Sequence, residues 1–151
     1  MQILYDLFEN KIFLTSALSW LIAQILKTLI HTFFTRSFDP ERLVGSGGMP
    51  SSHSATVTAL SVATYFEYGV SSFEFAIAAI LAIIVMYDAR GVRRETGKQA
   101  ELLNDILKIF EDMGRSEIST HDKLKEFVGH TPLQVLMGAV LGFAIALLMY
   151  L

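Results

Sequence analysis

Two stretches of the sequence are long enough and apolar enough to cross a lipid bilayer. Residues 12–34 contain Gln24, Lys27 and His31 as their strongly polar members, and residues 133–151 contain no charge. A membrane helix needs roughly 20 apolar residues to cross hydrocarbon about 30 Å thick. The whole chain is 52% hydrophobic and 18% charged, whereas soluble domains average about 45–50% apolar and about 25% charged residues. These features predict an integral membrane protein.

Two further spans are expected at residues 54–68 and 72–87. The second is a dense run of Ala, Ile, Leu, Val and Met, whereas the first is richer in Ser, Thr and Ala. We expect the more polar helix to be shielded from lipid by the others. The sequence therefore predicts an all-α membrane bundle of about four transmembrane helices. This bundle forms a single integral membrane domain over residues 1–151.

The positive charges indicate how the bundle is oriented. Segments 35–52 and 88–132 hold ten of the twelve Lys and Arg residues. The positive-inside rule places both segments in the cytoplasm, which predicts cytoplasmic active-site loops on a plasma-membrane protein. Within the second segment, residues 100–113 have the periodicity of an amphipathic helix lying in the membrane interface. A helix that binds a protein partner is the alternative for this stretch.

Small residues repeat every four positions in two of the expected helices. One row is Ala55, Ala59 and Ala63, and the other is Gly138, Gly142 and Ala146. Small residues at this spacing let helix backbones approach closely in lipid. The rows predict packing inside the bundle, with a homodimer seam as the alternative.

Several polar groups gather at the expected cytoplasmic ends of the spans, where ionisable residues are costly and mark function by default. Pro50-Ser51-Ser52-His53 follows a glycine-rich segment and opens the second span, so its free N–H groups and hydroxyls predict an anion site. The third span ends in a run of acidic and basic residues, in which paired guanidinium groups suit a phosphate. The remaining candidates are Asp88, Arg93, Arg94, His130 and Lys27.

Other classes of protein are excluded by composition. The chain has no cysteine, which excludes disulfides, thiolate metal sites and a cysteine nucleophile. Its net charge of −3 does not suit nucleic acid as a partner, because nucleic-acid binding needs a basic surface. No metal and no cofactor is expected. The expected partners are a lipid phosphate and the bilayer itself.

At these residues the chain resembles the phosphatidic acid phosphatase type 2 superfamily, in its divergent branch of small uncharacterised membrane proteins. Pro50-Ser51-Ser52-His53 is similar to the second superfamily signature, Pro-Ser-Gly-His, and the segment from Gly129 to Val135 is similar to the end of the third. Lys27 matches the lysine of the first signature, with Arg42 as a candidate companion. The run from Tyr87 to Arg94 is characteristic of the divergent branch.

The resemblance implies metal-free hydrolysis of a phosphomonoester through a phosphohistidine. His130 is then the nucleophile, and His53 is the acid that protonates the leaving alkoxide. Lys27, Arg42, Ser51, Ser52, Arg93 and Arg94 are the residues expected to bind the phosphate.

One departure concerns the aspartate that orients the nucleophilic histidine in the superfamily, because Gln134 stands at its position here. A second is that no arginine lies six residues before His130. Asp88 is the candidate to replace the missing carboxylate. The expected substrate resembles phosphatidylglycerophosphate or phosphatidic acid. A catalytically degenerate lipid-phosphate-binding protein and a small transporter are the alternatives.

Overall fold

The structure of the chain is a computed structural model that describes residues 1–37, 48–113 and 129–151. Its described residues form α-helices and no strand, which confirms the all-α prediction. The helices are α1 (Gln2–Glu9), α2 (Lys11–Thr35), α3 (Ser52–Tyr68), α4 (Phe73–Arg90), α5 (Val92–Asp112) and α6 (Pro132–Tyr150).

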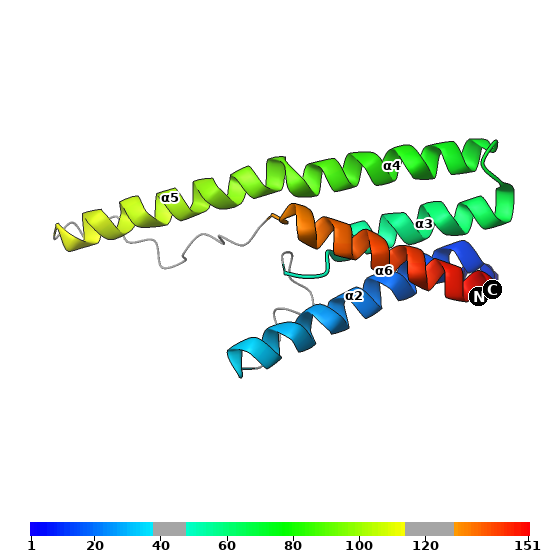
Figure 1. Cartoon of the computed structure of the whole chain (residues 1–151), viewed down its shortest axis with the longest axis horizontal. Helices are drawn as coiled ribbons and strands as arrows, with labels where there is room; N and C mark the ends of the chain where they lie inside the picture. Colours follow the sequence, from blue (N-terminus) through cyan, green and yellow to red (C-terminus); the bar gives the residue numbers. More distant parts are fainter. Residues whose placement is uncertain (38–47, 114–128) are drawn as a thin grey trace.

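Helix α3 lies in the middle of the bundle and packs against α2, α4 and α6 (Figure 1). Helices α2 and α6 also contact each other, so α3 is enclosed on several sides. The central position agrees with the expectation that the helix richest in Ser, Thr and Ala is shielded from lipid. Its Ala55, Ala59 and Ala63 are completely buried.

The two rows of small residues account for the tight packing of α3 against α6. A Cβ added to Gly142 would collide with the carbonyl oxygen of Ala55, and one added to Gly138 would collide with that of Ser51. Ala146 is also completely buried. The rows are therefore internal packing surfaces of the bundle, as the first interpretation predicted. They are not exposed as a seam for a second copy.

Three helical segments of the described chain are long and apolar enough to cross a membrane. They are Lys11–Thr35, Phe73–Phe110, which takes in α4 and most of α5, and Pro132–Tyr150. Helix α3 has 17 residues, which at 1.5 Å per residue is about 25 Å of helix. A fourth span at α3 therefore stays a prediction, as do the boundaries of the membrane domain.

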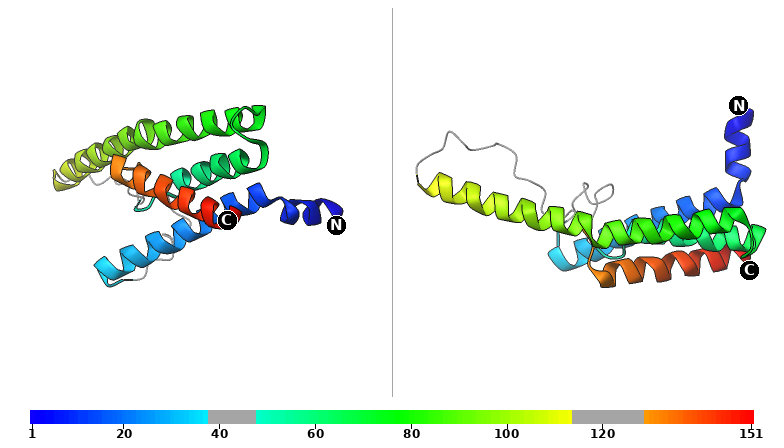
Figure 2. Two further views of the ribbon diagram at one scale, coloured as in Figure 1. Left: turned by 45° about the vertical axis from the view of Figure 1, so that its right-hand side comes forward. Right: turned by 90° about the horizontal axis from the view of Figure 1, so that it is seen from above.

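Helix α5 begins directly after Gly91 and continues along the direction of α4, projecting beyond the rest of the bundle (Figures 1 and 2). It starts earlier than the expected helix at residues 100–113. Apolar side chains along it are exposed, among them Leu102, Leu103 and Ile106. The helix itself is confirmed, and its placement in the membrane interface stays a prediction.

The chain begins and ends toward the same end of the bundle, but α1 projects away from the other helices and carries the N-terminus apart from the C-terminus (Figures 1 and 2). At this end the hydroxyl of Tyr150 donates to Glu67 Oε1 at 2.9 Å, and Lys11 Nζ lies 4.1 Å from the centre of the Tyr150 ring. Helix α1 turns away from α2 at Asn10, whose side chain caps α2 by accepting the N–H of Phe13 at 3.0 Å. The sequence analysis did not predict α1. The other end of the bundle carries the polar candidates.

Candidate functional site

The structure brings together two histidines that are 77 positions apart in the sequence. His53 lies in the first turn of α3, and His130 lies just before the start of α6. Their ring centroids are 5.9 Å apart and the rings are inclined at 62°. His130 is 2% exposed, whereas His53 is partly exposed. The two rings therefore lie next to each other at this end of the bundle.

The start of α6 determines how His130 is held. Thr131 and Gln134 form a capping box, in which the Thr131 side chain accepts the N–H of Gln134 at 3.3 Å. In return, the side-chain oxygen of Gln134 accepts the N–H of Thr131 at 3.0 Å. The same oxygen lies 3.3 Å from Nδ1 of His130. Gln134 thus stands beside the histidine whose orienting carboxylate the sequence lacks.

This arrangement assigns the proton on the His130 ring. The backbone N–H of Thr131 is a donor and needs an acceptor. The side-chain atom of Gln134 that it contacts must therefore be the amide oxygen and not the amide nitrogen. A carbonyl oxygen cannot donate, so its hydrogen bond with His130 requires the proton on Nδ1. In the neutral ring, the other nitrogen, Nε2, then carries the lone pair that a nucleophile needs.

Two backbone hydrogen bonds join the helix ends around the histidines. The N–H of His130 donates to the carbonyl oxygen of Ala89, in the last turn of α4, at 3.0 Å. The N–H of Ser51 donates to the backbone carbonyl oxygen of Gln134, also at 3.0 Å. Asp88 precedes Ala89, which brings its backbone close to that of His130. Its expected role in orienting His130 stays a prediction.

The serines that open α3 are buried at the site. Ser51 is completely buried and Ser52 is 4% exposed. The hydroxyl oxygen of Ser51 accepts from the backbone N–H of Ser54 at 3.3 Å and from its hydroxyl at 3.1 Å. Ser51 therefore caps α3 and contributes to local packing. Its part in binding a phosphate, like that of Ser52, stays a prediction.

Lys27 reaches the same end of the bundle from the interior of α2. Its side chain is buried, with a relative exposure of 3%. Gly48 lies against the aliphatic part of this side chain, because a Cβ on that glycine would be 2.9 Å from Lys27 Cγ. Gly48 has a φ of 84°, in the left-handed region that favours glycine. The glycine therefore allows the segment before α3 to pass close to the lysine.

The remaining candidates are described only in part. Arg93 and Arg94 lie in the first turn of α5, a few residues after Ala89. Arg42 lies outside the described residues. Across residues 1–37, 48–113 and 129–151, no group of three or more His, Asp or Glu side chains is placed to hold a metal ion.

Two features of the site were not predicted from the sequence. One is the capping box, although the pattern Thr131-Pro-Leu-Gln134 before an apolar run is a readable signal for it. The other is the close approach of Gly48 to Lys27. No sequence pattern indicated that approach, because it depends on how α2 and α3 pack.

Comparison with known proteins places this geometry in context. A family model described as the divergent PAP2 family matches residues 8–145. An uncharacterised membrane protein of Bacillus subtilis (strain 168), YuiD, is 38% identical over 152 residues. That similarity covers 95% of this chain and 96% of the relative. No solved structure gives a significant match.

Proposed function

Because the chain belongs to the divergent PAP2 family, we propose that this membrane protein is a phosphatase for lipid phosphates. The reaction is metal-free hydrolysis of a phosphomonoester through a phosphohistidine intermediate. One observation carries the proposal. It is the meeting of His53 and His130, with 5.9 Å between ring centroids, at an end of the bundle that also holds Lys27.

The first step transfers the phosphoryl group to the protein. Nε2 of His130 attacks phosphorus and forms the N–P bond, while the bond from phosphorus to the lipid oxygen breaks. His53 in its protonated form gives its proton to the departing alkoxide, which leaves as an alcohol. Histidine suits both roles, since its ring titrates near neutral pH.

The second step releases phosphate. His53, now neutral, removes a proton from water, and the resulting hydroxide attacks phosphorus and breaks the N–P bond. Inorganic phosphate leaves, and both histidines return to their starting states. The positive charge of Lys27, together with Arg42, Arg93 and Arg94, stabilises the phosphoryl oxygens in both steps. The N–H groups that begin α3 add to this stabilisation.

Gln134 favours a second candidate function. An amide next to His130 fixes the ring but supplies no negative charge for the imidazolium that forms on phosphoryl transfer. A protein that binds lipid phosphates without hydrolysing them needs the cations and the helix ends but not that charge. Measured turnover separates the two functions.

The orientation of the site selects among lipid phosphates. The excess of Lys and Arg in segments 35–52 and 88–132 favours a site on the cytoplasmic face. Lipid phosphates made on that face, such as phosphatidylglycerophosphate or phosphatidic acid, are the substrates that it meets first.

The test is phosphate release by the purified protein from a panel of lipid phosphates. His53→Ala and His130→Ala should each abolish turnover, whereas His121→Ala, at a histidine with no assigned role, should leave it unchanged. The wild type should accumulate a phosphoryl-enzyme that resists alkali, and His130→Ala should not. Turnover that survives His130→Ala would refute the phosphohistidine mechanism. Lipid-phosphate binding without any turnover would instead identify the non-hydrolysing function.

A further inference from the structure

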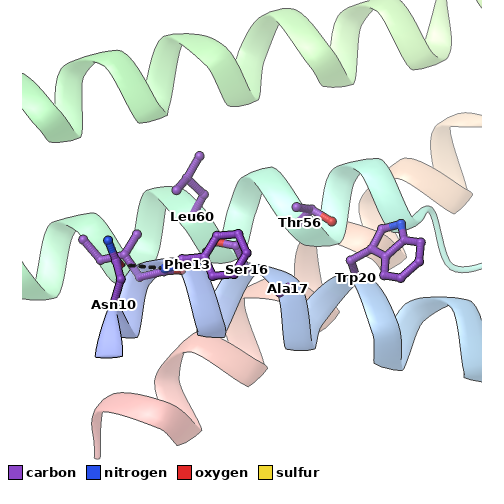
Figure 3. Close-up of a pocket in the computed structure, with 8 residues that line it drawn as sticks. Asn10, Phe13, Ser16, Ala17, Trp20, Thr56 and Leu60 are labelled. Atoms are coloured by element: carbon purple, nitrogen blue, oxygen red, sulfur yellow. Dashed lines mark hydrogen bonds between the residues drawn. The ribbon is translucent and has the colours of Figure 1, made fainter. Parts of the chain in front are cut away.

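A groove of about 540 Å³ runs between α2 and α3 (Figure 3). Six of the residues that line it are Phe13, Ser16, Ala17 and Trp20 from α2, and Thr56 and Leu60 from α3. None of the lining residues carries a charge. The groove lies within the segment of α2 that is apolar enough to cross a membrane.

The groove runs along the same faces of α2 and α3 as two residues of the candidate site. Thr56 and Leu60 follow His53 by three and seven residues, so all three lie on one face of α3. Trp20 precedes Lys27 by seven residues, which places them on one face of α2. In Figure 3, Trp20 and Thr56 lie toward the end of the groove where α3 begins, and Asn10 and Leu60 lie toward the other end. The nearest groove residue along α3, Thr56, is therefore about one helical turn from His53.

We infer that the groove holds one hydrocarbon chain of the lipid phosphate whose headgroup occupies the site. This inference rests on the proposed function and identifies how the substrate is oriented. The uncharged lining, the membrane setting and the short distance along α3 from His53 all fit an acyl chain. Both Phe13 and Trp20 are 42% exposed, so the groove is open at its side and a chain can enter it laterally from the bilayer.

The groove acts on orientation more than on affinity. A lipid chain is already surrounded by hydrocarbon in the bilayer, so its transfer into an apolar groove gains little from the hydrophobic effect. What the groove supplies is a fixed direction, which aligns the phosphate ester with His130. Filling the groove should therefore impair turnover of long-chain lipids more than that of short-chain substrates.

Trp20 makes the inference directly measurable, because it is the only tryptophan in the chain. The probe is a non-hydrolysable phosphonate analogue of phosphatidic acid with brominated chains, which quench tryptophan fluorescence on contact. At equal mole fraction in nanodiscs, it should quench Trp20 more than a phosphatidylcholine with the same brominated chains. The excess quenching should saturate and should be lost in Ala17→Phe, which fills the groove.

Two further variants control for indirect effects. Thr56→Leu fills the groove from the opposite wall and should also remove the excess quenching, even if Ala17→Phe fails to fold. Leu18→Phe enlarges a neighbouring side chain that does not line the groove, and it should behave as wild type. In turnover assays, Ala17→Phe should lower kcat/KM for a long-chain substrate by about tenfold relative to a short-chain one.

The outcomes separate this inference from the proposed function. Equal quenching by both brominated lipids would show that bulk lipid fills the groove, and absence of quenching by either would show that protein covers it. Either result overturns the inference, even if phosphate release is observed. Excess quenching without phosphate release from any lipid would support the chain site and refute hydrolysis.

Discussion

Replacing Gln134 by glutamate tests how the site compensates for its missing carboxylate. Glutamate can keep the capping box, since the pattern Thr-x-x-Glu forms the same pair of hydrogen bonds. Its carboxylate would take the place of the amide oxygen that now lies 3.3 Å from His130 Nδ1. In the proposed reaction the ring becomes positively charged when Nε2 attacks phosphorus, and a carboxylate at this place would stabilise that charge.

The magnitude follows from the kind of hydrogen bond. A neutral hydrogen bond contributes about 0.5–1.5 kcal/mol and one to a charged group about 1.5–3 kcal/mol. A gain of about 1–1.5 kcal/mol in the transition state corresponds to a roughly five- to tenfold increase in kcat/KM. The new charge at the start of α6 also interacts favourably with the helix dipole, so the thermal stability should not fall.

The assay is initial-rate phosphate release, with circular dichroism melting to monitor folding. Gln134→Asp is the matched variant, because its shorter side chain cannot make both contacts and should gain less. An unchanged or lower kcat/KM for Gln134→Glu, in a protein that melts like wild type, would refute the reasoning. If Asp88→Asn then reduced turnover severely, Asp88 would be the group that already supplies the charge.

Three other predictions concern packing, the lysine and the membrane orientation. Gly142→Leu should lower the melting temperature through its collision with α3, because overpacking costs about 1–3 kcal/mol. Ala144→Leu, at an exposed position of the same helix, should be tolerated, and equal melting temperatures of the two variants would contradict the packing. Gly48→Ala should reduce turnover, because its φ of 84° and the nearby Lys27 side chain leave a Cβ no room; a wild-type rate would show that this approach is not needed. A membrane-impermeant maleimide on intact cells should label a cysteine introduced at position 10 and miss one at position 116, whereas the reverse pattern would invert the orientation.

The fold was largely predictable because its main signals are periodic and local. The apolar runs at residues 12–34, 72–87 and 133–151 correspond closely to α2, α4 and α6. The small residues that join α3 to α6 were also visible as a four-residue repeat. Helix α1 was not predicted, because its eight residues are too few to form a membrane span.

The site was predictable in its residues but not in its contacts. His53 and His130 stood out because each is polar and lies within three residues of a proline at the start of an apolar segment. Gln134 was placed at the position of the superfamily's orienting aspartate, but its oxygen is shared between Thr131 and Nδ1 of His130, and that sharing depends on the geometry of the first turn of α6. The groove beside Trp20 was missed for a similar reason. It depends on the separation of two helices, which no run of residues in one helix reveals.

The positions of the two histidines are fixed in part by atoms that substitution rarely changes. The N–H of His130 is anchored to α4 and that of Ser51 to α6 through backbone hydrogen bonds. Every amino acid except proline retains such a donor. Side chains around the site can therefore be substituted during evolution, as with a glutamine in place of an aspartate, while the helix ends keep their positions. This architecture is suited to diversification, because a new headgroup or a new reaction requires new side chains but no new scaffold.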